Sequence, residues 1–266
     1  MAEDFLSQIA AYKQDLVARQ KKYRSEASLR RDAEIAVERR GFIRHMESDD
    51  IDSIHIIAEI KRASPSKGVI RDNLDAAATA AAYQQGGASA ISVLTEDHFF
   101  KGSVDDLIAA RRAATLPVLR KDFTLTTYQI YESAVIGADA ILLIVRMLSK
   151  NQLKDYMALC DDLNLDALVE IHSAEDIRTM EGTSARLIGI NNRNLQSFDT
   201  DIKNAMNLVA GLLPGQIPVA ASAIQSRDDI EKNQKAGIRH FLIGESIVRS
   251  EDPAAFIRTL KAHKGQ

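Results

Sequence analysis

Acidic and basic side chains stand two residues apart in the segment 55–68, HIIAEIKRASPSKG. Its first half is an apolar, β-branched run of strand length that carries Glu59 and Lys61. On a strand, this spacing places both side chains on the same face. Its second half, from Ser64 to Gly68, has the composition of a turn suited to a phosphate. The segment predicts proton-transfer chemistry, although an isolated pair of this kind is more often a plain ion pair.

The elements that must position these residues follow a regular order. Short apolar runs begin near residues 56, 88, 117, 139, 167, 186, 217 and 240. Helical patterns separate them, at residues 74–85, 104–114, 128–136, 150–163, 174–180, 202–213, 228–236 and 253–262. The runs are continuous rather than alternating, as in parallel strands that are covered on both faces. This order predicts a (β/α)8 TIM barrel; a doubly wound open sheet is the alternative, but no G-x-G-x-x-G follows the first strand.

Polar residues recur at the predicted strand ends, which converge on one mouth of such a barrel. They are Glu59, Lys61, Thr95, Glu96, Lys121, Asp122, Arg146, Glu170, Asn191, Arg193, Ser222, Gly244, Glu245 and Ser246. Any one of them alone could be a solvated or ion-paired side chain. Lysines and carboxylates gathered at one partly dry mouth, however, are typical of sites whose pKa values are tuned for proton transfer.

Two further signals concern what the mouth binds. Gly244 ends the last predicted strand and precedes a short predicted helix, which is where TIM barrels commonly bind phosphate, and Ser64 and Ser222 could add hydroxyl donors. Phe100 and Phe123 follow two strands. They are equally consistent with ordinary core and with an apolar slot for a planar ring.

The composition excludes several classes of protein. The chain has 266 residues and a net charge of -3, so no global basic field favours nucleic acid or an anionic membrane. No apolar run is long enough to cross a membrane, and the N-terminus lacks the layout of a signal peptide. One cysteine, Cys160, suits a reducing compartment, so we expect a cytoplasmic protein. The histidines show no metal-ligand spacing, and we expect no metal.

Residues 1–50 differ from the rest in being polar, rich in Arg and Lys, and free of β-branched runs. Apolar residues within 5–23 recur at three- and four-residue spacing, which predicts an amphipathic helix. We expect a single barrel domain, residues 1–266, of which 1–50 form an N-terminal helical extension. Its basic face is more simply a solvated surface than a docking site.

The order of these motifs resembles the indole-3-glycerol phosphate synthase family of tryptophan biosynthesis. The likeness runs through the segments 57–68, 94–96, 100–103, 120–123, 137–144, 169–171, 188–193 and 241–244. It covers essentially the whole chain, including residues 9–13 of the extension. The resemblance implies a carboxy-lyase that closes the indole ring of 1-(2-carboxyphenylamino)-1-deoxyribulose 5-phosphate, with loss of CO₂ and water. It implies neither a cofactor nor a metal.

The resemblance also implies roles for individual residues. Lys121 would be the general acid at the substrate carbonyl, and Lys61 would hold the ring carboxylate and assist dehydration. Glu170 would act as base, Glu59 would position the lysines, and Asn191 would bind the sugar hydroxyls, with Arg193 bracing the mouth. The aromatic ring would lie in a slot formed by Phe100, Phe123 and Leu142. The phosphate would lie among Ser64, Ser222, Ala223, Gly244 and Glu245.

The seventh strand departs from the family. Where the family reads Glu-Ser-Gly-Ile, this chain has Ala221-Ser222-Ala223-Ile224. Ala221 removes a carboxylate from the catalytic cluster, and Ala223 disfavours the positive φ that a glycine accepts. We therefore expect reduced activity or an altered substrate preference.

Three alternatives follow. The first is a phosphosugar isomerase of the same fold, which would need a cysteine at a strand end, whereas Cys160 falls in a predicted helix. The second is a barrel that binds the phosphosugar with impaired or altered activity because of Ala221 and Ala223. The third is a scaffold that docks through its basic extension. No fused second enzyme is expected, and the sequence identifies no protein partner.

Overall fold

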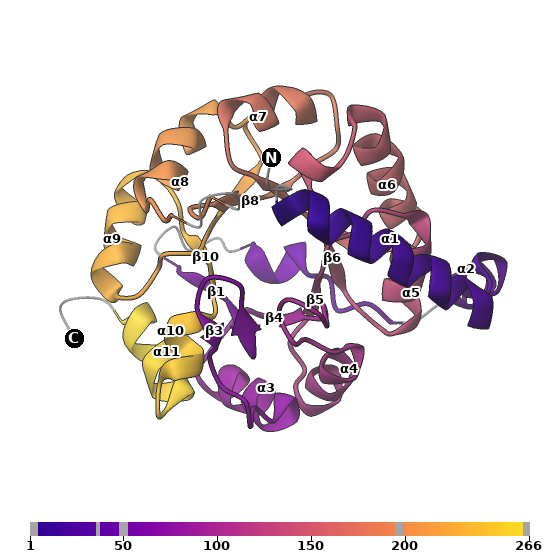
Figure 1. Ribbon diagram of the computed structural model, residues 1–266. Coiled ribbons are helices and arrows are strands. Elements are labelled where there is room, and N and C mark those ends of the chain that lie inside the picture. Colours follow the sequence, from indigo (N-terminus) through magenta and orange to yellow (C-terminus); the bar gives the residue numbers. More distant parts are fainter. Residues whose placement is uncertain (1–4, 36–37, 48–52, 195–198, 263–266) are drawn as a thin grey trace.

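Eight parallel strands close into a barrel in a computed structural model that describes residues 5–35, 38–47, 53–194 and 199–262 (Figure 1). They are β1 (His55–Ile60), β4 (Ala90–Leu94), β5 (Val118–Lys121), β6 (Ala140–Ile144), β7 (Asp166–Ile171), β8 (Leu187–Asn191), β9 (Ile217–Ala221) and β10 (His240–Ile243). Each strand pairs with the next along the chain, and β10 pairs with β1 to close the ring. The predicted TIM barrel is confirmed.

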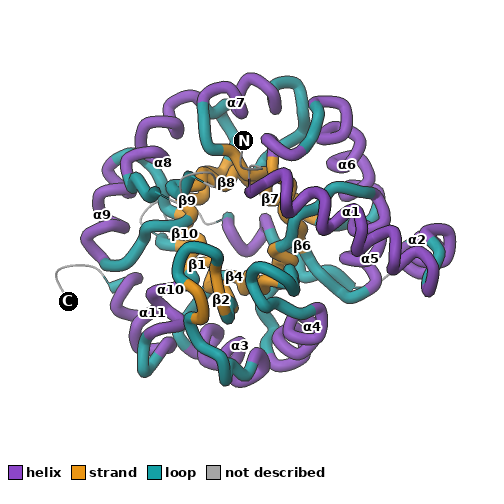
Figure 2. The backbone as a smooth tube through the Cα atoms, viewed as in Figure 1, coloured by secondary structure: helices purple, strands orange, loops and turns teal. Residues whose placement is uncertain are grey.

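Helices surround the ring of strands (Figure 2). They are α3 (Ala76–Gln85), α4 (Val104–Ala113), α5 (Thr127–Val135), α6 (Lys150–Asp162), α7 (Ala174–Met180), α8 (Lys203–Leu208), α9 (Arg227–Lys235), α10 (Glu245–Arg249) and α11 (Pro253–Lys261). Side chains of Ser149, Ser173 and Ser226 cap α6, α7 and α9 by accepting backbone N–H bonds. The predicted helix 202–213 is shorter than expected, because after α8 the chain tightens into the 3₁₀ turn η3 (Val209–Gly211).

Two apolar layers hold the barrel together. The outer layer lies between strands and helices and contains the mid-helix Cys160, whose thiol pKa is raised by burial. The inner layer fills the barrel with side chains from alternate strand positions, including Ile57, Leu119, Leu168 and Leu242. Because the inner layer is packed solid, a ligand can enter only at the ends of the strands.

The segment before β1 closes the barrel at the N-terminal ends of its strands. Phe42 and Met46, the latter in the 3₁₀ turn η1 (Ile43–Met46), are buried in the inner layer. Arg40 precedes this turn, and its guanidinium donates to the carbonyls of Ala114 and Leu116 at 2.7 and 2.8 Å. These bonds satisfy carbonyls where the chain enters β5.

The helix α1 (Phe5–Tyr23) lies across the opposite end of the barrel, and α2 (Glu26–Ala33) packs beside α5 (Figure 1). The predicted amphipathic helix is confirmed with the same bounds, and it buries Ile9, Lys13 and Val17. The rest of the expected extension includes residues 1–4, 36–37 and 48–50, which lie outside the described residues. None of the described helices is long and apolar enough to span a membrane.

The loop after β1 contains strands that the sequence analysis did not predict. Strands β2 (Ala63–Ser64) and β3 (Gly68–Val69) pair antiparallel, with the turn 65–67 between them. Gly68 has φ +64°, a conformation that favours glycine. This hairpin holds the Ser-Pro-Ser-Lys turn at the barrel mouth.

Candidate active site

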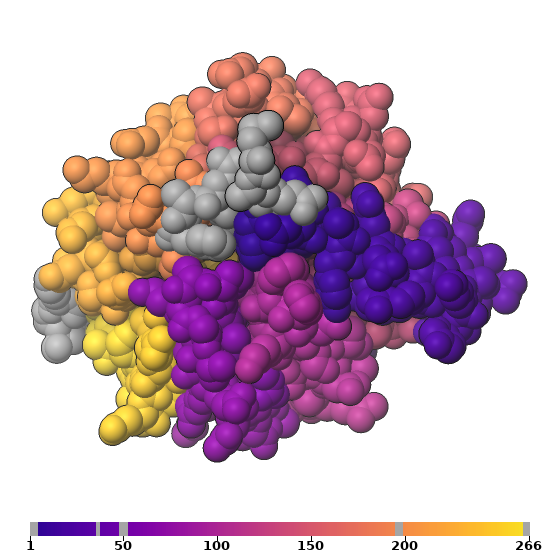
Figure 3. Space-filling model, viewed as in Figure 1, coloured from indigo at the N-terminus to yellow at the C-terminus, as the bar shows by residue number. Residues whose placement is uncertain are grey.

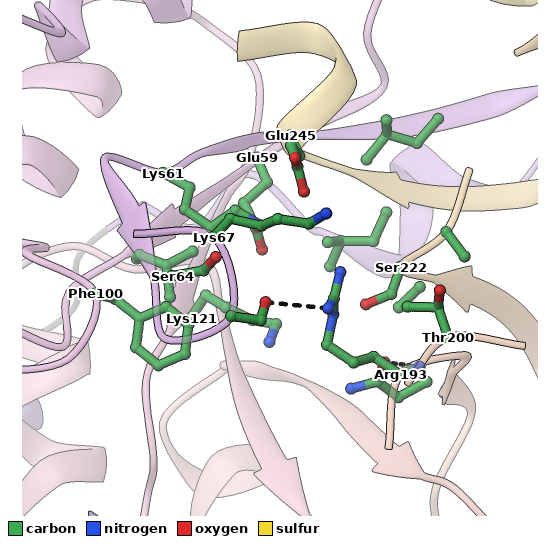
Figure 4. A pocket seen from close by; sticks show the side chains of 18 of the residues that line it. Glu59, Lys61, Ser64, Lys67, Phe100, Lys121, Arg193, Thr200, Ser222 and Glu245 are labelled. Carbon is green, nitrogen blue, oxygen red and sulfur yellow. Dashed lines mark hydrogen bonds and ion pairs between the residues drawn. The ribbon is translucent and has the colours of Figure 1, made fainter. Parts of the chain in front are cut away.

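A cavity of about 860 Å³ opens at the carboxyl ends of the barrel strands (Figure 4). Every site residue predicted from the sequence lines it: Glu59, Lys61, Ser64, Phe100, Lys121, Phe123, Leu142, Glu170, Asn191, Arg193, Ser222, Ala223, Gly244 and Glu245. The barrel closure brings them together from β1, β5, β6, β7 and β8, from the segments that follow β1, β4, β5, β8, β9 and β10, and from the first residue of α10. Their individual chemical roles remain predictions.

The first acid–base pair lies on and just after β1. Glu59 is 4% exposed, and its Oε1 lies 2.9 Å from the Lys61 Nζ. A Cβ added to Gly244 would lie 2.6 Å from the same Glu59 oxygen, so any other residue at the end of β10 would displace this carboxylate. Tyr83 of α3 donates its hydroxyl to the Glu59 carbonyl at 3.1 Å. Glu59 is therefore fixed by contacts with α3 on one side and with the end of β10 on the other.

The second pair bridges the barrel mouth. Lys121, the last residue of β5, places its Nζ 3.6 Å from Glu170 Oε2 on β7. Asn191, the last residue of β8, donates to the other Glu170 oxygen at 3.2 Å. The Asn191 side-chain oxygen in turn accepts the backbone N–H of Arg193 at 2.9 Å. Glu170 is thus oriented between an amide and an amine, both of which face the cavity.

The electrostatics of the mouth favour a charged Lys121. Burial lowers the pKa of its amine, but the carboxylates of Glu170 and Glu59 more than offset this, so the pKa lies above its ordinary value. A protonated lysine beside a cavity can donate a proton to a substrate oxygen, and the adjacent carboxylates can accept one.

One wall of the cavity is aromatic. The rings of Phe100 and Phe123 lie 6.0 Å apart at 41°, and Leu142 of β6 lines the same cavity. Glu96 shapes the Phe100 loop by accepting the backbone N–H of Phe99 at 2.7 Å and of Phe100 at 2.9 Å. Phe123 also belongs to the inner apolar layer, so the two rings pack on the core and line the cavity at the same time.

The end of β9 carries strained backbone. Ser222 and Ala223 both have positive φ, 67° and 62°, although neither is glycine. Asn192 donates its amide to the Ser222 carbonyl at 3.1 Å and so helps to hold this conformation. Ala221, which precedes the bend, is 4% exposed and lines the cavity. The structure therefore places Ala223 in the backbone conformation that the sequence analysis assigned to a glycine.

Other strand-end residues serve the scaffold or lie elsewhere. Arg146 pairs with Asp176 at 3.1 Å and does not line the cavity. Thr95 donates to Asp122, whose carboxylate pairs with Lys13 and Arg120. Of these strand-end residues, Asp122 lines the cavity, whereas Arg146 and Thr95 do not.

Several lining residues were missed by the sequence analysis: Phe5, Lys67, Asp199, Thr200 and Arg249. Lys67 lies in the turn of the hairpin, and Figure 4 shows its side chain extending over the cavity. Its place in a polar turn after a strand was the signal available. Phe5 comes from α1 and gave no such signal. The sequence of this helix does not indicate which part of the barrel it packs against. Among the described residues, no cluster of three or more His, Cys, Asp or Glu could hold a metal.

The closed parallel barrel, with lysine–carboxylate pairs around a cavity at the carboxyl ends of its strands, places this chain in the class of TIM-barrel enzymes. Solved structures show the same fold. The chain is similar to 3-hexulose-6-phosphate synthase from Salmonella typhimurium with a TM-score of 0.62 and 12% identity, covering 78% of this chain and 97% of that one. It is also similar to thiamine phosphate pyrophosphorylase from Pyrococcus furiosus, with a TM-score of 0.57 and 14% identity, covering 79% and 94%.

Sequence comparison is more specific. Residues 6–260 match the profile of the indole-3-glycerol phosphate synthase family, and the chain belongs to this family. The indole-3-glycerol phosphate synthase of Desulfosudis oleivorans is 50% identical, covering 97% of this chain and 98% of the relative. That of Bordetella pertussis is 42% identical, covering 97% and 99%. The resemblance read from the motifs is confirmed, and the match favours neither an isomerase nor a non-catalytic barrel.

Proposed function

We propose that the cavity closes the indole ring of 1-(2-carboxyphenylamino)-1-deoxyribulose 5-phosphate, with loss of CO₂ and water. The single observation that carries this proposal is the placement of two lysine–carboxylate pairs and one aromatic wall around the same cavity. Membership of the family supports it. The reaction needs an acid at a carbonyl oxygen, a site for a carboxylate and a base, and this set of side chains supplies all three.

The roles follow from the positions of the side chains. Lys121 donates a proton to the carbonyl oxygen as the carboxylated ring carbon attacks the carbonyl carbon. Lys61, held by Glu59, binds the ring carboxylate until it leaves as CO₂, and then assists loss of the hydroxyl as water. Glu170 accepts the proton that is released as the ring becomes aromatic. Asn191 orients Glu170 and contacts the sugar hydroxyls.

The cavity also suits a substrate with one flat end and one anionic end. Figure 4 shows Phe100 on one side and Ser222 and Arg193 on the other, with the Lys67 side chain extending between them. The ring would lie against Phe100, Phe123 and Leu142. The phosphate would lie among Ser64, Ser222, Ala223, Gly244 and Glu245, with Arg193 bracing the mouth through a 3.0 Å bond to Ser66.

The test is Lys121→Ala, assayed with the carboxyphenylamino-deoxyribulose phosphate by following the indole chromophore. Loss of a general acid lowers kcat by about 10²–10⁴-fold. Lys232→Ala, which removes an exposed lysine of α9, is the matched control and should leave turnover unchanged. If the wild-type protein binds the substrate without forming indole, the barrel is a phosphosugar-binding protein and the proposal is wrong.

The rest of the proposal concerns the domain, the partners and the cellular location of the protein. We propose that the barrel and its extension, residues 1–266, work as one domain on a small phosphosugar, with no nucleic acid or membrane as partner. A cytoplasmic location fits a biosynthetic family and a single, buried cysteine, Cys160. Fractionation of cells that carry a tagged chain would test the location.

A further inference from the structure

A buried lysine reaches from α1 into the end of β5. Lys13 is 2% exposed, and its Nζ lies 2.8 Å from Asp122 Oδ1. Asp122 follows Lys121 directly, so its carboxylate leaves the strand on the other face, toward Lys13 and Arg120, although the residue also lines the cavity. A helix outside the barrel repeat is therefore tied by an ion pair to the residue beside the proposed general acid.

The Asp122 carboxylate also bonds Phe123, the next residue in the chain, and Thr95 after β4. Its Oδ1 also accepts the backbone N–H of Phe123 at 2.8 Å, and its Oδ2 accepts the Thr95 hydroxyl at 2.8 Å. Lys121 and Phe123 both line the cavity, one as proposed acid and the other in the ring slot. The Asp122 carboxylate thus fixes the backbone between Lys121, the proposed acid, and Phe123 of the proposed ring slot.

The charges around this carboxylate come from four elements. Lys13 faces it from α1 and Arg120 from β5, and together they hold the pKa of Asp122 at about 2 against the effect of burial. Glu132 of α5 pairs with Arg120 at 2.7 Å. The loop after β4 adds Glu96, close enough to Lys13 to interact with it electrostatically, and Asp97. On the cavity side, Lys121 faces Glu170, Glu59 and Asp122.

Stability alone is a weak reason for such a pair. Burying an ammonium and a carboxylate costs desolvation energy that their attraction only partly offsets. An apolar contact of similar size would fasten α1 equally well, and α1 already has such contacts: Phe5 packs on Phe99 at 5.2 Å, and Tyr12 stacks on His98 at 4.8 Å. What a directional ion pair adds is a fixed position for Asp122.

From these contacts we infer that Lys13 is a positioning residue, which holds Lys121 and Phe123 in place through Asp122. This inference rests on the proposed function. Figure 3 shows the surface of α1 lying beside that of the segment after β4, at the edge of the mouth. Because Phe5 of α1 also lines the cavity, the helix contributes to the site both directly and through Asp122.

The test is Lys13→Met, which keeps the length of the side chain and removes its charge. Asp122 retains Arg120, Thr95 and the Phe123 amide, so the variant should fold. We expect kcat to fall by about tenfold or more, because small misplacements of catalytic groups are costly. KM should change less, and Lys13→Arg should recover most of the lost kcat.

Two controls separate positioning from docking of the helix. Tyr12→Phe removes the 2.9 Å bond to Asp97 and should lower the Tm with little effect on kcat. Lys22→Met removes an exposed lysine at the far end of α1 and should change neither. If Lys13→Met lowers only the Tm, as Tyr12→Phe does, Lys13 is merely structural and the inference is wrong.

A structural readout decides the inference independently of turnover. Inactivity of the wild-type protein would overturn the proposed function but not this inference. Crystal structures of the wild type and Lys13→Met would then be compared at the Lys121 Nζ–Glu170 Oε2 distance, which is 3.6 Å here. A displaced Lys121 in the variant supports the inference, and an unchanged distance overturns it.

Discussion

The Lys121 amine and the Glu170 carboxylate face each other across the barrel mouth, with Nζ 3.6 Å from Oε2. This separation lies within the range of an ion pair but beyond the 2.7–3.2 Å typical of a hydrogen bond to nitrogen (about 2.9 Å on average). The lysine is therefore kept charged by Glu170 without being tightly bound to it. A proton donor and a proton acceptor that stay separate can act on the same substrate in successive steps.

Glu170→Gln should lower kcat by about 10²–10⁴-fold, because the amide cannot accept the proton released from the ring. It should also lower the pKa of Lys121, since Glu170 is among the carboxylates that raise it. Indole formation measures the first effect. Glu175→Gln, on the exposed face of α7, is the control. Equal activities of the two variants would exclude Glu170 as the base.

Ala223→Gly should relieve the backbone at the end of β9. A left-handed conformation costs an alanine about 1 kcal/mol more than a glycine, which is partly offset by the greater entropy of glycine in the unfolded chain. We expect a small gain in the free energy of unfolding, by urea denaturation, and a higher kcat/KM. The control is Ala236→Gly, at the negative φ of -91°, which should destabilise. A loss of stability in both variants would contradict the strain argument.

Ala221→Glu should raise kcat/KM by returning a carboxylate to the lysine cluster. The residue ends β9 and lines the cavity, so an ionised side chain there can pair with a lysine. Ala221→Gln has almost the same size but no charge, and separates the charge effect from crowding. Indole assays of both variants decide the point: no advantage of Glu over Gln would mean that the cluster works without a third carboxylate.

Acid should destabilise the protein through the histidines at the closed end of the barrel. His55 and His240 stack at 4.9 Å, and burial together with the neighbouring His240 lowers the pKa of His55 to about 4 from an ordinary 6.5. Between these values the unfolded chain binds a proton that the folded chain does not. The stability is therefore fully present above about pH 6.5 and declines as the pH falls towards 4.

The size of this effect is about 2 kcal/mol, because His55 is only half-buried and solvent screens part of the shift. His55→Gln should flatten the pH dependence of the free energy of unfolding between pH 7 and 4. The exposed His45→Gln should not. Parallel curves for the wild type and His55→Gln would show that other groups dominate.

How much the sequence predicts can be seen at particular residues. Glu59, Lys61 and Lys121 were found because each stands at the end of an apolar run, and a parallel barrel gathers all such ends at one mouth. Lys13 could not be found in this way. Its spacing within 5–23 marks it only as part of a helix, and its burial against Asp122 depends on where that helix docks.

The sequence by itself determined the order of strands and helices, the strand-end positions of the polar residues and membership of the family, because these depend on local periodicity and on motifs. Only the tertiary structure decided which side chains meet. Barrel closure pairs Lys121 with Glu170, and the docking of α1 pairs Asp122 with Lys13. It also holds Ala223 at φ 62°. Contacts between distant segments depend on three-dimensional packing, and no local pattern encodes them.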